Sequence, residues 1–338
     1  MLNKNVKPTV AIIGAGLAGL SCATRLQAQG FEVHVFEKSR GPSGRMSTRN
    51  GENWSADHGA QYFTARDPLF IEELKTWIQA GVAAAWHPRL KVYESGMWRD
   101  SNTNENRYVG VPAMNSPGKY LAKNLPVQYS QTIDHLAYKN GKWIVHTAEM
   151  GTIEAQFDCI VLAIPAPQAF ALTHSTEPSI KAKEHQVDML GCWTVMASFK
   201  TKQDLSFDAA FVNGEIISWI ARNNSKPQRE GLESWTIHAN PQWSQQWIEL
   251  DKDEASKRIL ECAKALGLDC QEAEIIVHRW RYASGSIGAN PGFTVYDDIP
   301  LSLCGDWLHG GRVEGAWLSG YKLANELISK QNQLVHKD

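Results

Sequence analysis

The sequence predicts an α/β protein in two parts, a Rossmann-type nucleotide-binding domain and a mixed α+β domain. Three observations lead to this prediction. Residues 9–37 read as strand, glycine-rich turn, helix and strand, which is the size of one βαβ unit. Residues 190–282 contain several segments that alternate as a sheet with one covered face would. The section from residue 300 onward returns to strand, glycine-rich loop and helix.

The first βαβ unit follows from local patterns. A short apolar run at 9–13 ends in glycine, which is typical of a buried parallel strand. A helical pattern runs from Leu17 to Gln29, and Gly30 is suited to end that helix. The alternating segment 31–37 then reads as the second strand.

Weaker patterns predict the remaining elements. Residues 39–67 are rich in Gly, Ser, Arg and Asp and predict an extended functional loop with short strands. Asp67 and Pro68 open a predicted helix at 68–80, and another helix is expected after Asn115. Further strands are predicted at 126–130, 133–138, 142–147, 159–164, 190–199, 216–221, 233–239 and 274–282, with an amphipathic helix at 251–267.

These elements predict how the chain is divided. The nucleotide-binding domain is expected to comprise residues 1–85, 126–172 and 284–338, and the substrate domain residues 86–125 and 173–283. Many of the 13 tryptophans lie between residues 193 and 317. They either fill a core and an interface or line the substrate side of the molecule.

Composition excludes several classes of partner. The chain has 338 residues and a net charge of -2, which provides no field to gather nucleic acid or an anionic membrane. It contains no run of 18 apolar residues and no apolar leader before the first strand, so we expect a cytoplasmic location. The six cysteines form no CxxC pair and no group with zinc spacing, so no metal site is predicted.

The first chemical motif is the glycine turn of the βαβ unit. Gly14 permits the tight turn, Gly16 lets a pyrophosphate approach the backbone, and Gly19 allows close packing of helix and strand. Glu37, at the end of the second strand, would accept hydrogen bonds from ribose hydroxyls and would repel a ribose phosphate, which disfavours NADP. NAD and FAD both remain compatible with this motif. The predicted contacts are Gly14, Gly16, Leu17, Ala18, Gly19 and Glu37.

Two further motifs favour FAD. The segment after Glu37 resembles the extended fingerprint of FAD oxidoreductases of the glutathione-reductase type, especially the amine-oxidase branch with its Gly-Gly-Arg segment, although Ser43 replaces one glycine here. Arg45 can neutralise a pyrophosphate, or it is a surface arginine of the loop. The resemblance implies cofactor contacts from Lys38, Gly44, Arg45 and Met46.

The section near the C-terminus resembles the second cofactor signature of the same enzymes. It implies that Gly305 and Asp306 contact the ribityl and pyrophosphate part of FAD. A helix that begins near Gly315 and Ala316 would point its N-terminus at the flavin pyrimidine ring, where it stabilises the charge of reduced flavin. We therefore expect FAD as a non-covalent cofactor.

Four longer segments resemble bacterial renalase-like flavoproteins of the amine-oxidase-like superfamily. They are residues 47–50, 57–64, 235–244 and 278–283, in the order expected for that family. The resemblance covers nearly the whole chain. It implies a Rossmann-type FAD-binding domain with a mixed-sheet substrate domain, like that of p-hydroxybenzoate hydroxylase, in which His58, Gly59 and Ala60 belong to the cofactor loop.

The same resemblance implies a reaction. Renalases take a hydride from 2- or 6-dihydronicotinamide dinucleotides and pass two electrons to O2, which yields hydrogen peroxide. A donor that becomes an aromatic cation needs no general base, so the protein must mainly stack the nicotinamide on the flavin. The candidate lining residues are His238, Trp235, Tyr62 and Gln61. A structural role stays open for His238 and for His58.

Three alternatives are weighed against this interpretation. A flavin amine oxidase would usually carry a lysine at the flavin and often a cysteine bound to it, and no segment here matches either. A desaturase would need a long apolar tunnel. A protein that binds flavin without catalysis is the alternative from another class. Arg279 and Arg281 share one strand face, where they could meet substrate phosphates or form salt bridges.

Overall fold

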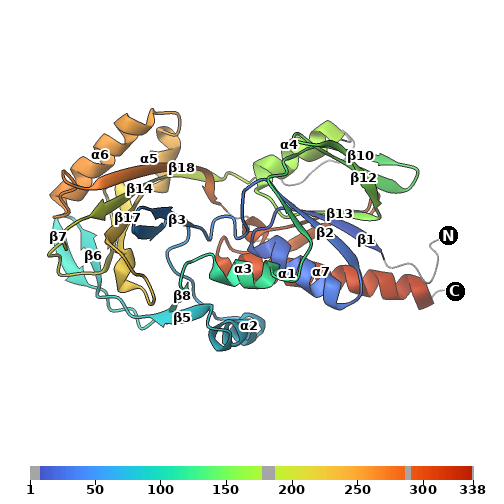
Figure 1. The fold of residues 1–338 in the computed structure, drawn as a ribbon, viewed down its shortest axis with the longest axis horizontal. Helices are drawn as coiled ribbons and strands as arrows, with labels where there is room; N and C mark the ends of the chain where they lie inside the picture. Colours follow the sequence, from blue (N-terminus) through green and yellow to red (C-terminus); the bar gives the residue numbers. More distant parts are fainter. Residues whose placement is uncertain (1–7, 177–186, 286–290, 337–338) are drawn as a thin grey trace.

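The computed structural model describes residues 8–176, 187–285 and 291–336. Two sheets lie at opposite ends of an elongated molecule, and both described chain ends lie beside the smaller sheet (Figure 1). That sheet has six strands in the order β19-β20-β13-β1-β2-β9, and the other has seven in the order β18-β14-β17-β16-β15-β6-β7. The predicted α/β architecture with a mixed-sheet second part is confirmed.

The six-stranded sheet contains the predicted βαβ unit. Five of its strands are parallel, and β19 pairs antiparallel at one edge. Its strands are β1 (Thr9–Ile13), β2 (Glu32–Glu37), β9 (Val127–Tyr129), β13 (Cys159–Leu162), β19 (Phe293–Val295) and β20 (Leu301–Cys304). A three-stranded sheet and α4 cover one side of it, with bounds β10 (Ile133–Lys139), β11 (Lys142–Thr147), β12 (Gly151–Phe157) and α4 (Ala166–Thr176).

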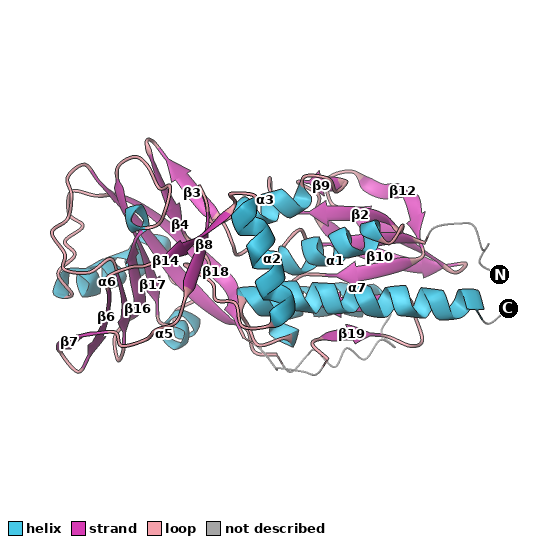
Figure 2. Ribbon diagram, turned by 90° about the horizontal axis from the view of Figure 1, so that it is seen from below, coloured by secondary structure: helices cyan, strands magenta, loops and turns pink. Residues whose placement is uncertain are grey.

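Helices α1 (Leu17–Ala28) and α7 (Val313–His336) run side by side on this sheet (Figure 2). Their backbones approach closely, because a Cβ added at Gly320 would lie 2.0 Å from the carbonyl oxygen of Ala18. The Ser21 hydroxyl also donates to the carbonyl of Trp317 at 2.9 Å. The two ends of the chain therefore form one packed unit, and α3 (Ser116–Ala122) packs against α1 as well.

The seven-stranded sheet carries two helices near its outer face. Its strands are antiparallel except that β15 runs parallel to β6. The bounds are β6 (Leu90–Glu94), β7 (Met97–Asp100), β14 (Leu190–Phe199), β15 (Ala209–Val212), β16 (Ile217–Arg222), β17 (Glu233–Ala239), β18 (Glu274–Ser284), α5 (Pro241–Gln246) and α6 (Lys252–Ala265). A core cluster that includes Trp193, Trp235 and Ile259 fills the space under α6.

Two two-stranded sheets and one helix lie between the larger sheets. Strands β3 (Thr48–Gly51) and β4 (Trp54–Asp57) occupy the segment predicted as a functional loop with short strands. Strands β5 (Ala83–Trp86) and β8 (Arg107–Gly110), which are separated by β6 and β7 in the chain, form a two-stranded antiparallel sheet beside α2 (Pro68–Gln79). Two short 3-10 helices, η2 (Asn223–Ser225) and η3 (Asp306–Leu308), complete the described elements.

The predicted domain division stays a prediction, and residues 1–7, 177–186, 286–290 and 337–338 of it lie outside the described residues. All strands of the seven-stranded sheet come from segments assigned to the substrate domain, whereas α3 of the segment 86–125 packs on α1. Within the described ranges, no helix is long and apolar enough to cross a membrane.

Candidate functional site

The glycine turn leaves open space at one position only. A Cβ at Gly14 would lie 2.6 Å from the Ala163 carbonyl oxygen, and one at Gly19 would lie 2.0 Å from the Gly14 carbonyl oxygen. A Cβ at Gly16 would meet nothing within 4 Å. The N-terminus of α1, where Leu17 and Ala18 stand, has no side-chain cap and no acidic residue in its first turn. Its positive end is available to a pyrophosphate at the open face of Gly16.

Glu37 lies beneath this turn at the end of β2. Its buried carboxylate accepts the N–H groups of Ala15 and Ser39, both at 2.8 Å. Each carboxylate oxygen can accept a second hydrogen bond, so ribose hydroxyls can still bind there. The predicted role of Glu37 is therefore compatible with its contacts.

The second predicted motif packs directly on the first. The N–H of Ser43 donates to the Ala15 carbonyl at 2.8 Å, and Ser43 forms a β-bridge with Gly16. Gly44 has φ +52°, and a Cβ there would lie 3.5 Å from Cα of Gly16. Met46 is buried beside this turn, whereas Lys38 is exposed.

Arg45 and Asp306 join the two cofactor signatures. The Arg45 guanidinium pairs with both oxygens of the Asp306 carboxylate and donates to the Ala283 carbonyl at 3.0 Å. The N–H of Gly305 donates to the hydroxyl of Ser319 on α7 at 2.9 Å. The segments predicted to hold one FAD therefore meet at one place.

The first turn of α7 requires glycine at position 315. A Cβ at Gly315 would lie 1.9 Å from the His309 carbonyl oxygen, so the preceding loop crosses the helix there. The Ala316 N–H donates to the Arg312 carbonyl at 2.9 Å and starts the helical ladder. The carboxylate of Glu314 accepts the N–H groups of Arg66 and Asp67 at 2.6 and 2.7 Å.

The segment 57–62 begins with a fully buried carboxylate. Asp57 accepts hydrogen bonds from Lys226 at 3.0 Å, Arg229 at 2.9 Å and the Thr48 hydroxyl at 2.6 Å. Burial by itself raises the pKa of Asp57, but the charges of Lys226 and Arg229 outweigh it and hold that pKa at about 2. The carboxylate stays charged and fully paired, which anchors the segment.

The carbonyl of His58 is held by two side chains of the seven-stranded sheet. His238 Nε2 donates to it at 3.2 Å and Trp280 Nε1 donates at 2.9 Å. Because a carbonyl oxygen only accepts, His238 carries its hydrogen on Nε2. The His58 ring stacks on Trp280 at 5.2 Å between centroids and meets the edge of His278 at 4.9 Å.

His238 and His278 belong to a row of four side chains that crosses the sheet, together with Trp219 and Thr194. In the strand register, Trp219 lies opposite His238, His238 opposite Thr194, and Thr194 opposite His278. Residues directly opposite each other project from the same face. Burial lowers the pKa of His238 and of His278 to about 4 and that of His58 to about 3. The row therefore presents neutral imidazoles to the segment 57–62 near neutral pH.

Gly59, Ala60 and Gln61, which follow His58, make contacts within the protein. A Cβ at Gly59 would lie 1.9 Å from the Arg45 carbonyl oxygen, which also accepts the Ala60 N–H at 2.9 Å. The Gln61 amide donates to the carbonyls of Asp57 and Gly59 and accepts from Lys226 at 3.3 Å. Gln61 thus positions the segment, and its amide is already engaged by the protein.

Tyr62 has the surroundings of a lining residue. Its ring lies 5.5 Å from the Trp219 ring and 6.2 Å from the Trp86 ring. The Arg107 guanidinium lies 5.2 Å from the centre of the same ring. We call Tyr62, Trp86, Arg107 and Trp219 the Tyr62 cluster.

The prediction for Trp235 is not supported, because the indole lies on the wrong face of the sheet. Positions 235 and 238 differ by three on one strand, so their side chains project to opposite faces. Trp235 is fully buried in the cluster under α6, and its N–H donates to Glu233 at 2.8 Å. It therefore packs in a core and does not join His238.

Of the two roles considered for Arg279 and Arg281, the structure shows salt bridges. Both pair with Glu249, and Arg279 also donates to the Ile248 carbonyl at 2.8 Å. Their charges are thus already engaged at the end of α5. No group of metal-ligating residues occurs among the described residues.

Several residues of the site carry no recognisable signal in the sequence. Lys226 and Arg229 follow a strand in a polar segment that reads as an ordinary surface turn. Thr194 and Trp219 belong to apolar strands, where packing is the default interpretation. Only the strand register places them beside His238.

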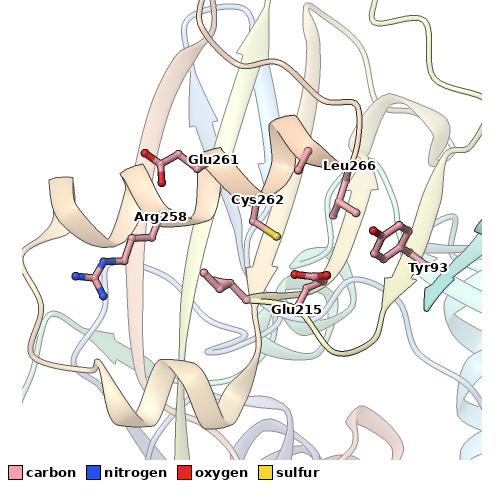
Figure 3. A pocket seen from close by; sticks show the side chains of 8 residues that line it. Tyr93, Glu215, Arg258, Glu261, Cys262 and Leu266 are labelled. Carbon is pink, nitrogen blue, oxygen red and sulfur yellow. The ribbon is translucent and has the colours of Figure 1, made fainter. Parts of the chain in front are cut away.

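A separate cavity of about 230 Å³ lies between α6 and the loop before β16 (Figure 3). Tyr93, Glu215, Arg258, Glu261 and Cys262 line it. Burial raises the pKa of the Cys262 thiol. None of the residues predicted to contact cofactor or substrate lines this cavity, so it is distinct from the candidate site.

Comparison with known proteins agrees with this geometry. The Exiguobacterium structure described as a putative protoporphyrinogen oxidase superposes with a TM-score of 0.76 at 11% identity, covering 96% of this chain and 100% of the other. Cyclohexylamine oxidase from Brevibacterium oxydans gives a TM-score of 0.74 at 13% identity, covering 97% and 100%. These similarities show a shared fold.

A curated relative matches over a shorter stretch. The zeta-carotene-forming phytoene desaturase of Myxococcus xanthus is 44% identical over 50 residues, which are 15% of this chain and 10% of the desaturase. The match thus spans a small part of that enzyme.

Two family profiles cover most of the chain. Residues 12–72 match the NAD(P)-binding Rossmann-like domain, and residues 73–328 match the flavin containing amine oxidoreductases. The second match alone spans most of the protein and includes the row of His238 and the Gly305–Asp306 signature. The residues present fit FAD, because Gly16 opens a space at an uncapped helix terminus and Arg45 meets Asp306 beside it. With its Rossmann turn, its paired signatures and its mixed sheet, the chain belongs to the family of flavin containing amine oxidoreductases.

Proposed function

We propose that the protein is an FAD-dependent oxidase that takes a hydride from 2- or 6-dihydronicotinamide dinucleotides and passes the electrons to O2. FAD, when bound, supplies the two-electron acceptor and the reaction with oxygen. Glu37, the N-terminus of α1, Arg45 and Asp306 would hold it. The remaining work of the protein is to position the segment 57–62 and the substrate.

The observation that carries this proposal is that the row of Trp219, His238, Thr194 and His278 on the sheet is uncharged near neutral pH. His238 and His278 have pKa values lowered to about 4 by burial, and Asp57 is paired with two cations. No free carboxylate therefore stands among the groups that contact the segment 57–62 in the described part of the chain. A dihydronicotinamide needs no base to release a hydride, because it leaves as an aromatic cation.

The charges near the segment also favour this substrate class. Lys226 and Arg229 are both buried and share one carboxylate, Asp57, and burial lowers the pKa of Lys226. Arg107 adds another cation at the Tyr62 ring. A dinucleotide is anionic, whereas a protonated amine would meet like charges here. This arrangement supports an anionic substrate.

Oxidation of an amine is the second candidate, and the comparisons favour it. The matching family is described as flavin containing amine oxidoreductases, and one structural neighbour is a cyclohexylamine oxidase. The aromatic rings of the Tyr62 cluster would suit the apolar part of an amine that binds uncharged. Desaturation is a weaker form of the same alternative, because the desaturase match spans 50 residues.

Anaerobic mixing of the purified holoenzyme with each substrate class tests the proposal. We expect a mixture of 2- and 6-dihydro-NAD to bleach the flavin, and air to restore the colour with formation of hydrogen peroxide. Bleaching by cyclohexylamine alone would establish the second candidate. If neither compound bleaches the flavin, the alternative of a non-catalytic flavoprotein replaces both.

A further inference from the structure

Two buried donors beside Tyr62 have no acceptor in the described part of the chain. They are Nε of Arg107 and Nε1 of Trp219. Each side chain belongs to a residue that is 6% exposed. The guanidinium lies 5.2 Å from the centre of the Tyr62 ring, and the centre of the indole lies 5.5 Å from it. Both side chains therefore adjoin one aromatic ring.

The Trp86 indole and the Nη atoms of Arg107 have partners within the protein. Trp86 Nε1 donates to the Ser225 hydroxyl at 3.2 Å. Arg107 uses its two Nη atoms on the Glu105 carbonyl at 3.1 Å and the Thr103 hydroxyl at 2.8 Å. Because a buried N–H without an acceptor retains its full desolvation penalty, the two remaining donors call for an acceptor from outside the chain.

The number of donors restricts the acceptor. Nε of Arg107 and Nε1 of Trp219 each carry a single N–H, and one carbonyl oxygen can accept two such bonds. A phosphate presents three oxygens and is usually met by the fork of a guanidinium, but both Nη atoms of Arg107 already donate to groups of the protein. An ammonium group carries only donors and would leave both atoms unpaired.

We propose that Arg107 and Trp219 bind the carbonyl oxygen of an aromatic carboxamide whose ring lies against Tyr62. The inference rests on the proposed function and names the part of the dihydronicotinamide that is recognised. Trp219 lies opposite His238 in the strand register, and His238 holds the His58 carbonyl at 3.2 Å. The carboxamide site therefore adjoins the segment 57–62.

Binding to the oxidised holoenzyme tests this site without turnover. Benzamide carries the carbonyl and aniline does not, and flavin absorbance reports the dissociation constant of each. We expect Trp219→Phe and Arg107→Met each to weaken benzamide about threefold to tenfold, the range of one hydrogen bond, and to leave aniline unchanged. Trp86→Phe is the matched control, since its N–H is satisfied within the protein and both probes should change by the same factor.

The outcomes separate this inference from the proposed function. Equal benzamide affinity in the two variants and in the parent would overturn the carbonyl site, as would a parent that binds no benzamide. If Arg107→Met does not fold, Arg107→Lys serves, because lysine keeps the charge without the Nε donor. Selective loss of benzamide in a protein that oxidises no dihydronicotinamide would refute the proposed function and support the site.

Discussion

Asp57 concentrates the charge that holds the segment 57–62 in place. Its carboxylate is paired with Lys226 and Arg229, and all three side chains are almost completely buried. Removal of the Asp57 carboxylate would leave two buried cationic side chains without their shared anion, and an uncompensated buried charge typically costs about 3–5 kcal/mol. It is the last residue of β4, and its two cationic partners lie far along the chain, at separations of 169 and 172 residues.

The buried histidines predict a loss of stability in mild acid. His238 has a folded pKa of about 4, and His58 one of about 3, whereas an unfolded histidine titrates near 6.5. Below about pH 6.5 the unfolded chain binds protons that the folded chain refuses, so the free energy of unfolding falls as the pH falls. From pH 7 to pH 5 each histidine should cost about 2 kcal/mol, at about 1.4 kcal/mol per pH unit.

Urea unfolding at pH 7 and pH 5 measures this effect. His238→Gln should remove about a third of the decrease expected from His58, His238 and His278, whose pKa values are all lowered, because glutamine can still donate to the His58 carbonyl and does not titrate. His135→Gln, at an exposed position, is the control and should keep the full decrease. An unchanged pH dependence in His238→Gln would contradict the assignment of a buried neutral imidazole.

At the scale of elements, alternation along a strand decided which predicted residues reached the site. His238 and Trp235 were predicted together, but β17 turns them to opposite faces. The βαβ unit was predicted well, with α1 observed over Leu17–Ala28, because its strand, turn and helix are all set by local sequence. Strands β5, β6, β7, β8, β12, β15 and β19 were not predicted. Strand β5 pairs with β8 and β6 with β15 across long stretches of chain, whereas β7 and β12 pair with the strand directly before them.

The contact of α1 with α7 predicts a sensitive glycine. In Gly320→Leu, the new Cβ would lie 2.0 Å from the Ala18 carbonyl oxygen, so the helices must move apart. We expect a destabilisation of about 1–3 kcal/mol, as for other overpacked contacts, together with weaker FAD binding, because Ala18 belongs to the cofactor turn. Thermal unfolding and FAD titration measure the two effects.

Ser329→Ala serves as the control for this variant, because Ser329 is exposed on the same helix. It should leave both the stability and the affinity for FAD unchanged. A Gly320→Leu protein with parental stability would show that α7 does not approach α1 at this position.

At the scale of the whole molecule, the two ends of the chain meet at the proposed cofactor site. The Arg45–Asp306 pair joins residues 261 positions apart. The sequence indicated the meeting of these two segments only through two separate motifs. In the structure, the parallel pairing of β1, β13 and β20 brings the carboxyl ends of these strands together. A ligand bound at this junction is coupled to the folding of both ends.

This coupling predicts a large stabilisation by FAD. With free FAD at 100 times its dissociation constant, the folded state gains about 2.7 kcal/mol, which raises the melting temperature by several degrees. Gly16→Val should fold with the melting temperature of the apoprotein and show no rise, since its side chain occupies the open space at the turn. A rise in Gly16→Val equal to that of the parent would place FAD elsewhere.

The same preparation tests whether FAD is held without a covalent bond. A hydrogen bond with Cys304 and burial raise the pKa of the Cys22 thiol well above its usual value, which makes it a poor nucleophile toward a flavin. We expect all of the FAD in the supernatant after acid precipitation of the protein. Flavin that remains with the precipitate would indicate a covalent link.

The sequence by itself determined the nucleotide-binding turn, the acidic residue beneath it and the two ends of the cofactor site. These features depend on glycine conformation, helix termini and short spacings, which are local. Only the tertiary structure decided which side chains surround the segment 57–62. The row of Trp219, His238, Thr194 and His278 and the partners of Asp57 depend on strand register and on contacts between distant segments. The pattern along one strand sets which of its side chains share a face, but the side chain that lies opposite each of them depends on pairing with a distant segment.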